Sequence, residues 1–273
     1  MLKSPFLFML LSTVLFAGES EQLGSTDSIE VGLPKVIYCV VALCDNATQG
    51  IAPVPAKLGN GNDADNNLYW GALYGIRSYF DRSDEWKRIS KARPLNTTVV
   101  ERCIYKHVKK DIYLIADAFR GSEIETAIGR VVSFGSAKHK LSFDFDRKTV
   151  QQRPSLIAYI GHNGLMEFAL DDDLSELPGS QDVVEIAENP TPAIILACYS
   201  KSYFKQELEG TSAYPLLWTT GLMAPEAYTL HEALAGWIEN ESDEQIRNRA
   251  AAAYHKYQKC GLRAARRLLI TGW

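Results

Sequence analysis

Residues 156–164 read LIAYIGHNG and residues 193–200 read AIILACYS, and these two stretches decide the fold. Each is a short apolar run preceded closely by a proline, Pro154 or Pro192, which is typical of a buried parallel strand. In open α/β sheets the chemistry lies just beyond the carboxyl ends of the strands. The first run ends at His162 and the second at Cys198, so the sequence predicts an imidazole beside a thiol at one sheet edge. That pair is the minimum for a cysteine nucleophile and its base.

Strand-like and helix-like segments alternate along the rest of the chain. We expect further strands at residues 36–43, 102–108, 112–116 and 215–220. We expect helices at residues 67–80, 123–134, 225–238 and 243–259, with Ser122 capping the second and Ser242 the fourth. This alternation predicts an α/β fold in which a mostly parallel central sheet carries helices on both faces, as a single domain over residues 35–273.

The first residues have the pattern of a targeting segment. Residues 1–18 combine a basic start, an apolar stretch too short to span a bilayer, and small residues before an acidic one. This predicts a signal peptide, followed by a flexible polar leader over residues 19–34. The alternative is an uncleaved membrane anchor. No second apolar run approaches membrane length, so we expect an exported protein, periplasmic or secreted, that does not contact the membrane after cleavage.

Charge and histidine placement narrow the partners. The formal net charge is −4, which gives no indication of a nucleic-acid partner. His231 and His255 lie in predicted helices without a second ligand at i+4, so we expect neither a metal nor a cofactor. His107 and His139 stand among lysines, and we expect both to be exposed. The sequence does not set the oligomeric state.

The chain contains five cysteines, an odd number for an exported protein. Cys198 is the expected unpaired one, because a catalytic thiol cannot stay in a disulfide. The other four could pair in combinations that the sequence leaves open, although Cys39 fits a buried free thiol equally well. These four are Cys39, Cys44, Cys103 and Cys260.

The order of these motifs resembles that of the caspase-like cysteine peptidases, a group that includes caspases, metacaspases, legumain and gingipains. Residues 159–162, YIGH, are similar to the metacaspase approach to its histidine, and residues 196–198, LAC, are similar to the Ala-Cys block of the whole group. Residues 218–228 look like the strand and specificity loop that follow the legumain cysteine. The resemblance implies a caspase-like three-layer sandwich and an endopeptidase acting on peptides or proteins, with Cys198 as nucleophile and His162 as acid/base.

The resemblance also implies an oxyanion hole, and here the sequence departs from the family. A glycine usually follows the histidine directly, whereas in this chain Asn163 precedes Gly164. The backbone N–H of Asn163 or Gly164, together with that of Cys198, would then stabilise the oxyanion.

Two loops, residues 57–65 and 220–226, correspond to the substrate pocket that the resemblance implies. They contain Asp63, Asp65, Thr220 and Glu226, and no arginine. Free carboxylates would favour a basic or neutral substrate residue over aspartate. The alternative is structural, with Asp63 capping a helix near Asn67 and Glu226 starting the helix after Pro225.

Other functional interpretations remain open. The insertion of Asn163 would also suit a catalytically inactive binding module, and the same dyad could serve a non-peptidase cysteine hydrolase. Only residues 201–214 separate Ser200 from the next predicted strand, and part of this stretch has a helical pattern. We therefore expect a single-chain enzyme without an internal cut at that place.

Overall fold

The two strands that carry His162 and Cys198 form and are neighbours. The computed structural model describes residues 34–50, 52–136, 139–145, 148–170 and 189–273. In it, β7 (Leu156–Ile160) pairs in parallel with β8 (Thr191–Leu196), and Ile160 lies opposite Leu196. The predicted signal peptide, residues 1–18, and the leader, apart from Pro34, lie outside the described residues.

An eight-stranded sheet in the order β10-β9-β8-β7-β1-β4-β3-β2 forms the centre of the described chain. The strands β9, β8, β7, β1 and β4 run parallel, whereas β3, β2 and β10 are antiparallel to their neighbours. The prediction of a mostly parallel sheet is confirmed. The remaining strands of this sheet are β1 (Lys35–Ala42), β2 (Trp86–Ala92), β3 (Val99–His107), β4 (Ile112–Phe119), β9 (Ala213–Thr219) and β10 (Leu269–Ile270). A separate hairpin joins β5 (Leu141–Phe145) to β6 (Lys148–Gln152).

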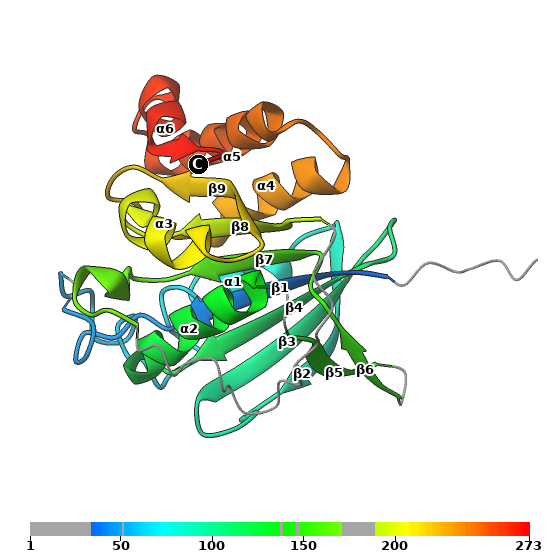
Figure 1. The fold of residues 1–273 in the computed structure, drawn as a ribbon. Helices are drawn as coiled ribbons and strands as arrows, with labels where there is room; N and C mark the ends of the chain where they lie inside the picture. Colours follow the sequence, from blue (N-terminus) through cyan, green and yellow to red (C-terminus); the bar gives the residue numbers. More distant parts are fainter. Residues whose placement is uncertain (1–33, 51, 137–138, 146–147, 171–188) are drawn as a thin grey trace, which may run out of the picture. The chain divides into compact units, whose positions relative to one another are not determined.

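Helices cover both faces of the sheet, as expected (Figure 1). Successive residues of β1 point to opposite faces, so Ile37 and Cys39 belong to one core while Tyr38 and Val40 belong to the other. The first core is closed by α1 (Ile76–Phe80), α4 (Ala227–Ile238) and α5 (Asp243–Gln258), and the second by α2 (Ile124–Gly135) and α3 (Ser200–Glu209). All of these elements lie in one compact unit, Pro34–Trp273.

The two edges of the sheet differ in character. Along β2 every residue from Lys87 to Lys91 is exposed. At the other edge α6 (Leu262–Leu268) follows α5 and leads into β10, which pairs with Trp218 and Thr219 of β9. Just beyond β10, the Gly272 N–H donates to the Pro215 carbonyl at 2.8 Å.

The predicted helix over residues 67–80 is wrong in its first two-thirds, because only Ile76–Phe80 is helical. The Asn67 amide accepts from the Cys44 N–H and donates to the Cys44 carbonyl, at 3.0 and 2.8 Å, so it fastens this segment to the end of β1. Gly71 lies so close to the backbone that an added Cβ would be 2.2 Å from the Asp65 carbonyl oxygen. Residues 67–75 therefore form consecutive turns over the sheet edge.

The two predicted helix caps have different outcomes. Ser122 is not a cap, because a 3-10 turn, η1 (Gly121–Glu123), leads into α2, and the N-cap residue there is Glu123, without a side-chain bond. Ser242 is a cap, as expected: its hydroxyl accepts from the Gln245 N–H, and the Gln245 side chain bonds back to the Ser242 N–H. The fold thus confirms the capping box and corrects the start of α2.

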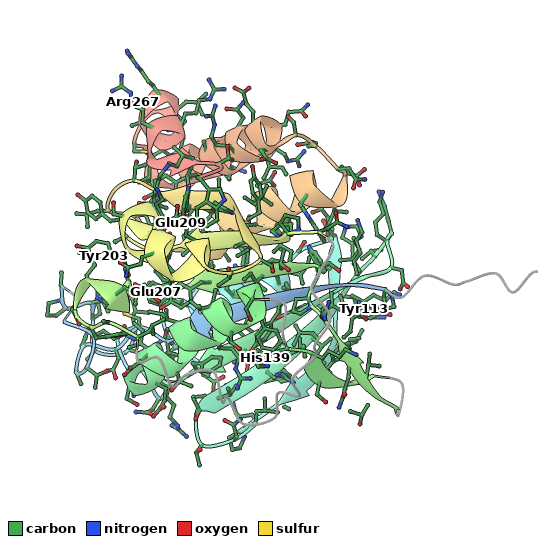
Figure 2. The ribbon with its side chains drawn as sticks, viewed as in Figure 1. Tyr113, His139, Tyr203, Glu207, Glu209 and Arg267 are labelled. Atoms are coloured by element: carbon green, nitrogen blue, oxygen red, sulfur yellow. The ribbon has the colours of Figure 1, made fainter. Side chains whose placement is uncertain are left out.

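The prediction that His107 and His139 are exposed is wrong, since they are only 8% and 4% exposed. His107 ends β3, where its Nδ1 accepts the N–H groups of Lys109 and Lys110 and its ring packs edge-on against Trp86. Burial lowers the pKa of His107. His139 packs against Phe134 near the end of α2 (Figure 2). Basic neighbours in sequence do not prevent an imidazole from being covered by aromatic rings.

A cavity of about 350 Å³ lies beside His107, lined also by Asp84, Lys109 and Glu239. Because β3 is antiparallel to β4, this cavity is at the sheet edge opposite the carboxyl ends of the parallel strands.

In the described part of the chain, no helix combines the length and apolar character needed to cross a membrane.

Candidate active site

The carboxyl ends of β7 and β8 are level, and this places the two predicted residues at one edge. Ile160 is registered opposite Leu196, and His162 and Cys198 each follow two residues later. The Gly161 N–H donates to the Leu196 carbonyl at 3.4 Å, which continues the pairing past the end of β7. The turn with His162 therefore lies alongside the turn with Cys198.

Cys198 differs from the other cysteines in its surroundings. All five cysteines are free thiols, but Cys39, Cys44 and Cys103 are fully buried, whereas Cys198 is partly exposed and Cys260 exposed. Burial raises the pKa of Cys44 to about 11 and that of Cys103 to about 12, and it raises the pKa of Cys39 further. The three buried thiols are therefore poor nucleophiles at neutral pH.

Backbone groups hold the Cys198 thiol in place. The Met223 N–H donates to its sulfur at 3.4 Å, and the thiol can donate to the Met223 carbonyl at 3.6 Å. These two contacts fix the sulfur against the backbone of residue 223. The next residue, Tyr199, has a left-handed backbone with φ of 50° and turns the chain sharply from β8 into α3.

His162 is held by a hydrogen bond to its backbone carbonyl and by one carboxylate beside its ring. The Tyr159 hydroxyl donates to the His162 carbonyl at 2.7 Å. The side chain is 14% exposed, and Nε2 lies 3.2 Å from Oε1 of Glu167. Nδ1, the other ring nitrogen, bonds to no residue that the structure describes. The imidazole thus keeps one nitrogen available for a proton from a neighbouring group.

Asn163, the residue that departs from the family pattern, ties the two turns together. It is completely buried, and its Nδ2 donates to the Cys198 carbonyl at 2.6 Å. Its Oδ1 is buried without a hydrogen-bond partner among the described residues. The structure therefore gives the Asn163 side chain a structural contact with the turn that carries the thiol.

The N–H groups of Gly164 and Cys198 suit the predicted oxyanion hole. Gly164 begins the 3-10 turn η2 (Gly164–Met166), where a first-turn N–H has no partner within the turn. Within the described chain neither N–H group bonds to a backbone or side-chain acceptor, and the same holds for the N–H of Asn163, the other donor that the sequence allowed. Unpaired donors at the edge where a carbonyl would be attacked are what an oxyanion needs.

The predicted pocket carboxylates on residues 57–65 are engaged by their own chain. Asp63 accepts the N–H groups of Asp65 and Asn66, so it stabilises a turn, which is close to its structural alternative. Asp65 forms ion pairs with Arg77 and Arg93, and hydrogen bonds from these guanidinium groups hold the pKa of Asp65 well below its usual range.

The second loop shows the same behaviour. The Thr220 hydroxyl donates to the Arg267 carbonyl at 2.8 Å. Glu226 precedes α4 without capping it, and its Oε2 accepts from the Tyr228 hydroxyl at 2.6 Å and from Gln258 at 3.0 Å. Leu222, next to the Met223 that holds the thiol, is 70% exposed. This loop thus exposes an apolar side chain, and its carboxylate already has partners.

Two residues of this edge were missed from the sequence. Glu167 contacts His162 across a five-residue gap that only the η2 turn closes, and residue type alone does not distinguish it from other surface carboxylates. Glu101 is completely buried on β3, where it bonds to the Trp70 indole and Arg77 and forms ion pairs with Lys91 and Arg93. Its place two residues before Cys103 and four before Tyr105, in step with the apolar face of β3, is the one signal that could have marked it.

Neither a protein-family model nor a curated protein nor a solved structure matches this chain. Among the described residues, no group of three or more His, Cys, Asp or Glu side chains is placed to hold a metal ion.

Proposed function

We propose that this chain is an exported, single-chain cysteine endopeptidase with the caspase-like three-layer arrangement, in which Cys198 is the nucleophile and His162 its acid/base. The observation that carries the proposal is the level register of β7 and β8, which sets the two side chains on adjacent turns at the carboxyl edge of the sheet. The exposure of Cys198, against the burial of three other thiols, supports the same assignment.

The chemistry follows from these groups. His162 takes the thiol proton as the sulfur of Cys198 attacks the peptide carbonyl, so a carbon–sulfur bond forms and the carbonyl oxygen becomes negative. The N–H groups of Gly164 and Cys198 stabilise that oxyanion. The carbon–nitrogen bond then breaks while the imidazolium gives its proton to the leaving amine. Water, deprotonated by His162, hydrolyses the thioester and regenerates the thiol.

The pocket residues narrow the expected substrate. Asp63, Asp65 and Glu226 all have partners in their own chain, so they offer little free charge to a basic side chain. Tyr199, which follows Cys198 in sequence, and Leu222, which precedes the Met223 that bonds to the thiol, are both exposed. Of the basic and neutral residues that the sequence allowed, the surroundings favour neutral, apolar ones before the scissile bond.

Labelling with a peptide electrophile tests the dyad. In a Cys260→Ser background we expect modification at Cys198 alone, and a rate that falls about 100-fold or more when His162 is replaced by alanine. Cys260→Ser serves as the matched control because it removes the other exposed thiol. An unchanged rate in His162→Ala would exclude the dyad.

A peptide library tests turnover and specificity together, with Cys198→Ala as the inactive control. We expect cleavage after apolar residues, and cleavage after aspartate would contradict the pocket assignment. Fast labelling of Cys198 without cleavage of any peptide would instead favour a binding module or a different cysteine hydrolase.

A further inference from the structure

We infer that Glu167 is a positioning residue that holds the His162 imidazole, an inference that rests on the proposed function for its catalytic consequence. Its Oε1 lies 3.2 Å from His162 Nε2. The approach is built by the η2 turn, in which the Gly164 carbonyl accepts the N–H of Glu167 at 2.8 Å and that of Phe168 at 3.1 Å. This turn reverses the chain and returns residue 167 to the ring of residue 162.

A second loop, the one after β1, also lies close to the Glu167 carboxylate. Gly50, in the loop after β1, has a positive φ of 58°, and a Cβ added there would lie 2.5 Å from Glu167 Oε1 and 3.0 Å from Cδ. The Glu167 side chain is 42% exposed, yet its Oε1 lies close both to Gly50 and to the imidazole. A residue with any side chain at position 50 would have to displace this carboxylate or move its own backbone.

The contact decides which ring nitrogen does the chemistry. With Nε2–H donating to Glu167, the neutral ring has its lone pair on Nδ1, the nitrogen without a described partner. Nδ1 is then the atom that accepts the Cys198 proton and later gives it to the leaving amine. Once the ring is protonated, the carboxylate also stabilises the imidazolium.

The size of the effect follows from exposure. A carboxylate buried behind its histidine contributes about 10⁴-fold to catalysis in the serine peptidases. Glu167 is half-exposed and screened by water, so we expect a roughly tenfold contribution to kcat. KM should stay within about twofold, because Glu167 is placed behind the ring and not toward substrate.

The test compares Glu167→Ala and Glu167→Gln with the distant control Glu209→Gln. In ¹⁵N-labelled full-length protein we expect a downfield Nε2–H proton signal of His162, assigned by its loss in His162→Ala. That signal should disappear in Glu167→Ala, persist weakened in Glu167→Gln, whose amide oxygen still accepts, and stay unchanged in Glu209→Gln. Turnover of a cleaved peptide should fall roughly tenfold in Glu167→Ala and less in Glu167→Gln.

A second variant approaches from the other loop. Gly50→Ala leaves Glu167 in the sequence but should abolish the same proton signal, provided that thermal unfolding shows a folded protein. An unchanged signal in Glu167→Ala overturns the inference while leaving the Cys198–His162 dyad intact. A wild type that shows the signal but hydrolyses no peptide overturns the proposed function, and the signal still decides whether Glu167 holds the ring.

Discussion

The side-chain amide of Asn163 donates a 2.6 Å hydrogen bond to the backbone carbonyl of Cys198, so the turn after β7 is fastened to the turn after β8. The two residues are 35 positions apart in sequence. Because the donor is completely buried, this bond sets how the thiol turn lies against the histidine turn. The buried Asn163 side chain thus has a structural role at this edge of the sheet.

Asn163→Ala should lower the free energy of unfolding by about 1–3 kcal/mol, since it removes a buried donor and leaves the Cys198 carbonyl without that partner. Asn163→Asp should cost more, because it sets a carboxylate against a carbonyl oxygen in a buried place. Urea unfolding measures both variants, and the electrophile labelling of Cys198 should slow in parallel. An aspartate variant as stable as the wild type would contradict this role.

Two thiols should react with a soluble disulfide reagent in the native protein, and five after unfolding. Cys198 and Cys260 are accessible, whereas Cys39, Cys44 and Cys103 are buried and their pKa values are raised by burial. Mass spectrometry of the purified, unreduced chain checks the same point. A total below five under denaturing conditions would show that some of these cysteines pair in a disulfide.

Glu101→Gln should destabilise the protein by about 1–3 kcal/mol at pH 7, because it removes a completely buried carboxylate charge and leaves the buried guanidinium of Arg77 paired with Asp65 alone among the described residues. Burial alone would raise the pKa of Glu101, but the Trp70 indole and the guanidinium groups of Arg77 and Arg93 together lower it. A lowered pKa means that this stabilisation is present above the unfolded-state pKa near ~4.3 and is lost as the pH falls through the folded value.

The difference in stability between wild type and Glu101→Gln should therefore shrink as the pH falls below about 4, which urea unfolding at several pH values would measure. Glu209→Gln is the control, because Glu209 forms an exposed pair with Lys205 at the end of α3, and such pairs contribute about 0.5 kcal/mol or less (Figure 2). An equal difference at every pH would show that Glu101 acts through packing alone.

Ser242→Ala should cost about 1 kcal/mol, because it breaks the capping box at the start of α5. Ser122→Ala, at the site where the sequence predicted a cap, should change stability by less than about 0.5 kcal/mol, since Ser122 caps no helix in the structure. Thermal unfolding of the pair gives a direct comparison. Equal losses in the two variants would show that Ser122 has a role outside the capping of α2.

Purified active protein should remain one chain across residues 201–214. Most of this stretch is α3 (Ser200–Glu209), and Phe204 and Leu208 anchor it in the core. A peptidase would have to unfold that helix before cutting it. Intact-mass measurement of active material checks this, and two stable fragments divided between residues 201 and 214 would refute it.

The two strands that lead to His162 and Cys198 could be predicted because they are almost entirely apolar. Residues 156–160 and 191–196 are buried on both faces by helices, so their composition records their environment directly. The strand β2 was missed for the opposite reason: between Trp86 and Ala92 it is an exposed, polar edge strand, and its sequence resembles a loop. The strand β5 does alternate apolar and polar residues, as LSFDF, so the signal was present and was missed, whereas β10 is only two residues long and carries none.

The errors at the site have one physical origin, which is competition from side chains far away in sequence. Asn67 bonds to Cys44, and its segment forms turns instead of the expected helix. Arg93 forms an ion pair with Asp65, so that carboxylate is not free to bind substrate. Glu167 contacts His162 only because of a turn whose geometry cannot be predicted from the amino-acid sequence. The positions of the strand ends could be predicted from the sequence, whereas the contacts between the loops that follow them could not.

The two margins of the sheet, described above as a charged strand and a short antiparallel strand, also govern how this protein behaves at high concentration. An edge strand with unpaired N–H and C=O groups is a template for another chain, and aggregation into fibrils begins there. The lysines and the arginine of β2 repel a second copy at one margin. At the other margin, residues 269–272 already bond to part of β9, and Pro215 has no N–H to donate to a second copy. The outermost strand there, β10, is only two residues long, so it offers few free N–H and C=O groups on which a fibril could grow.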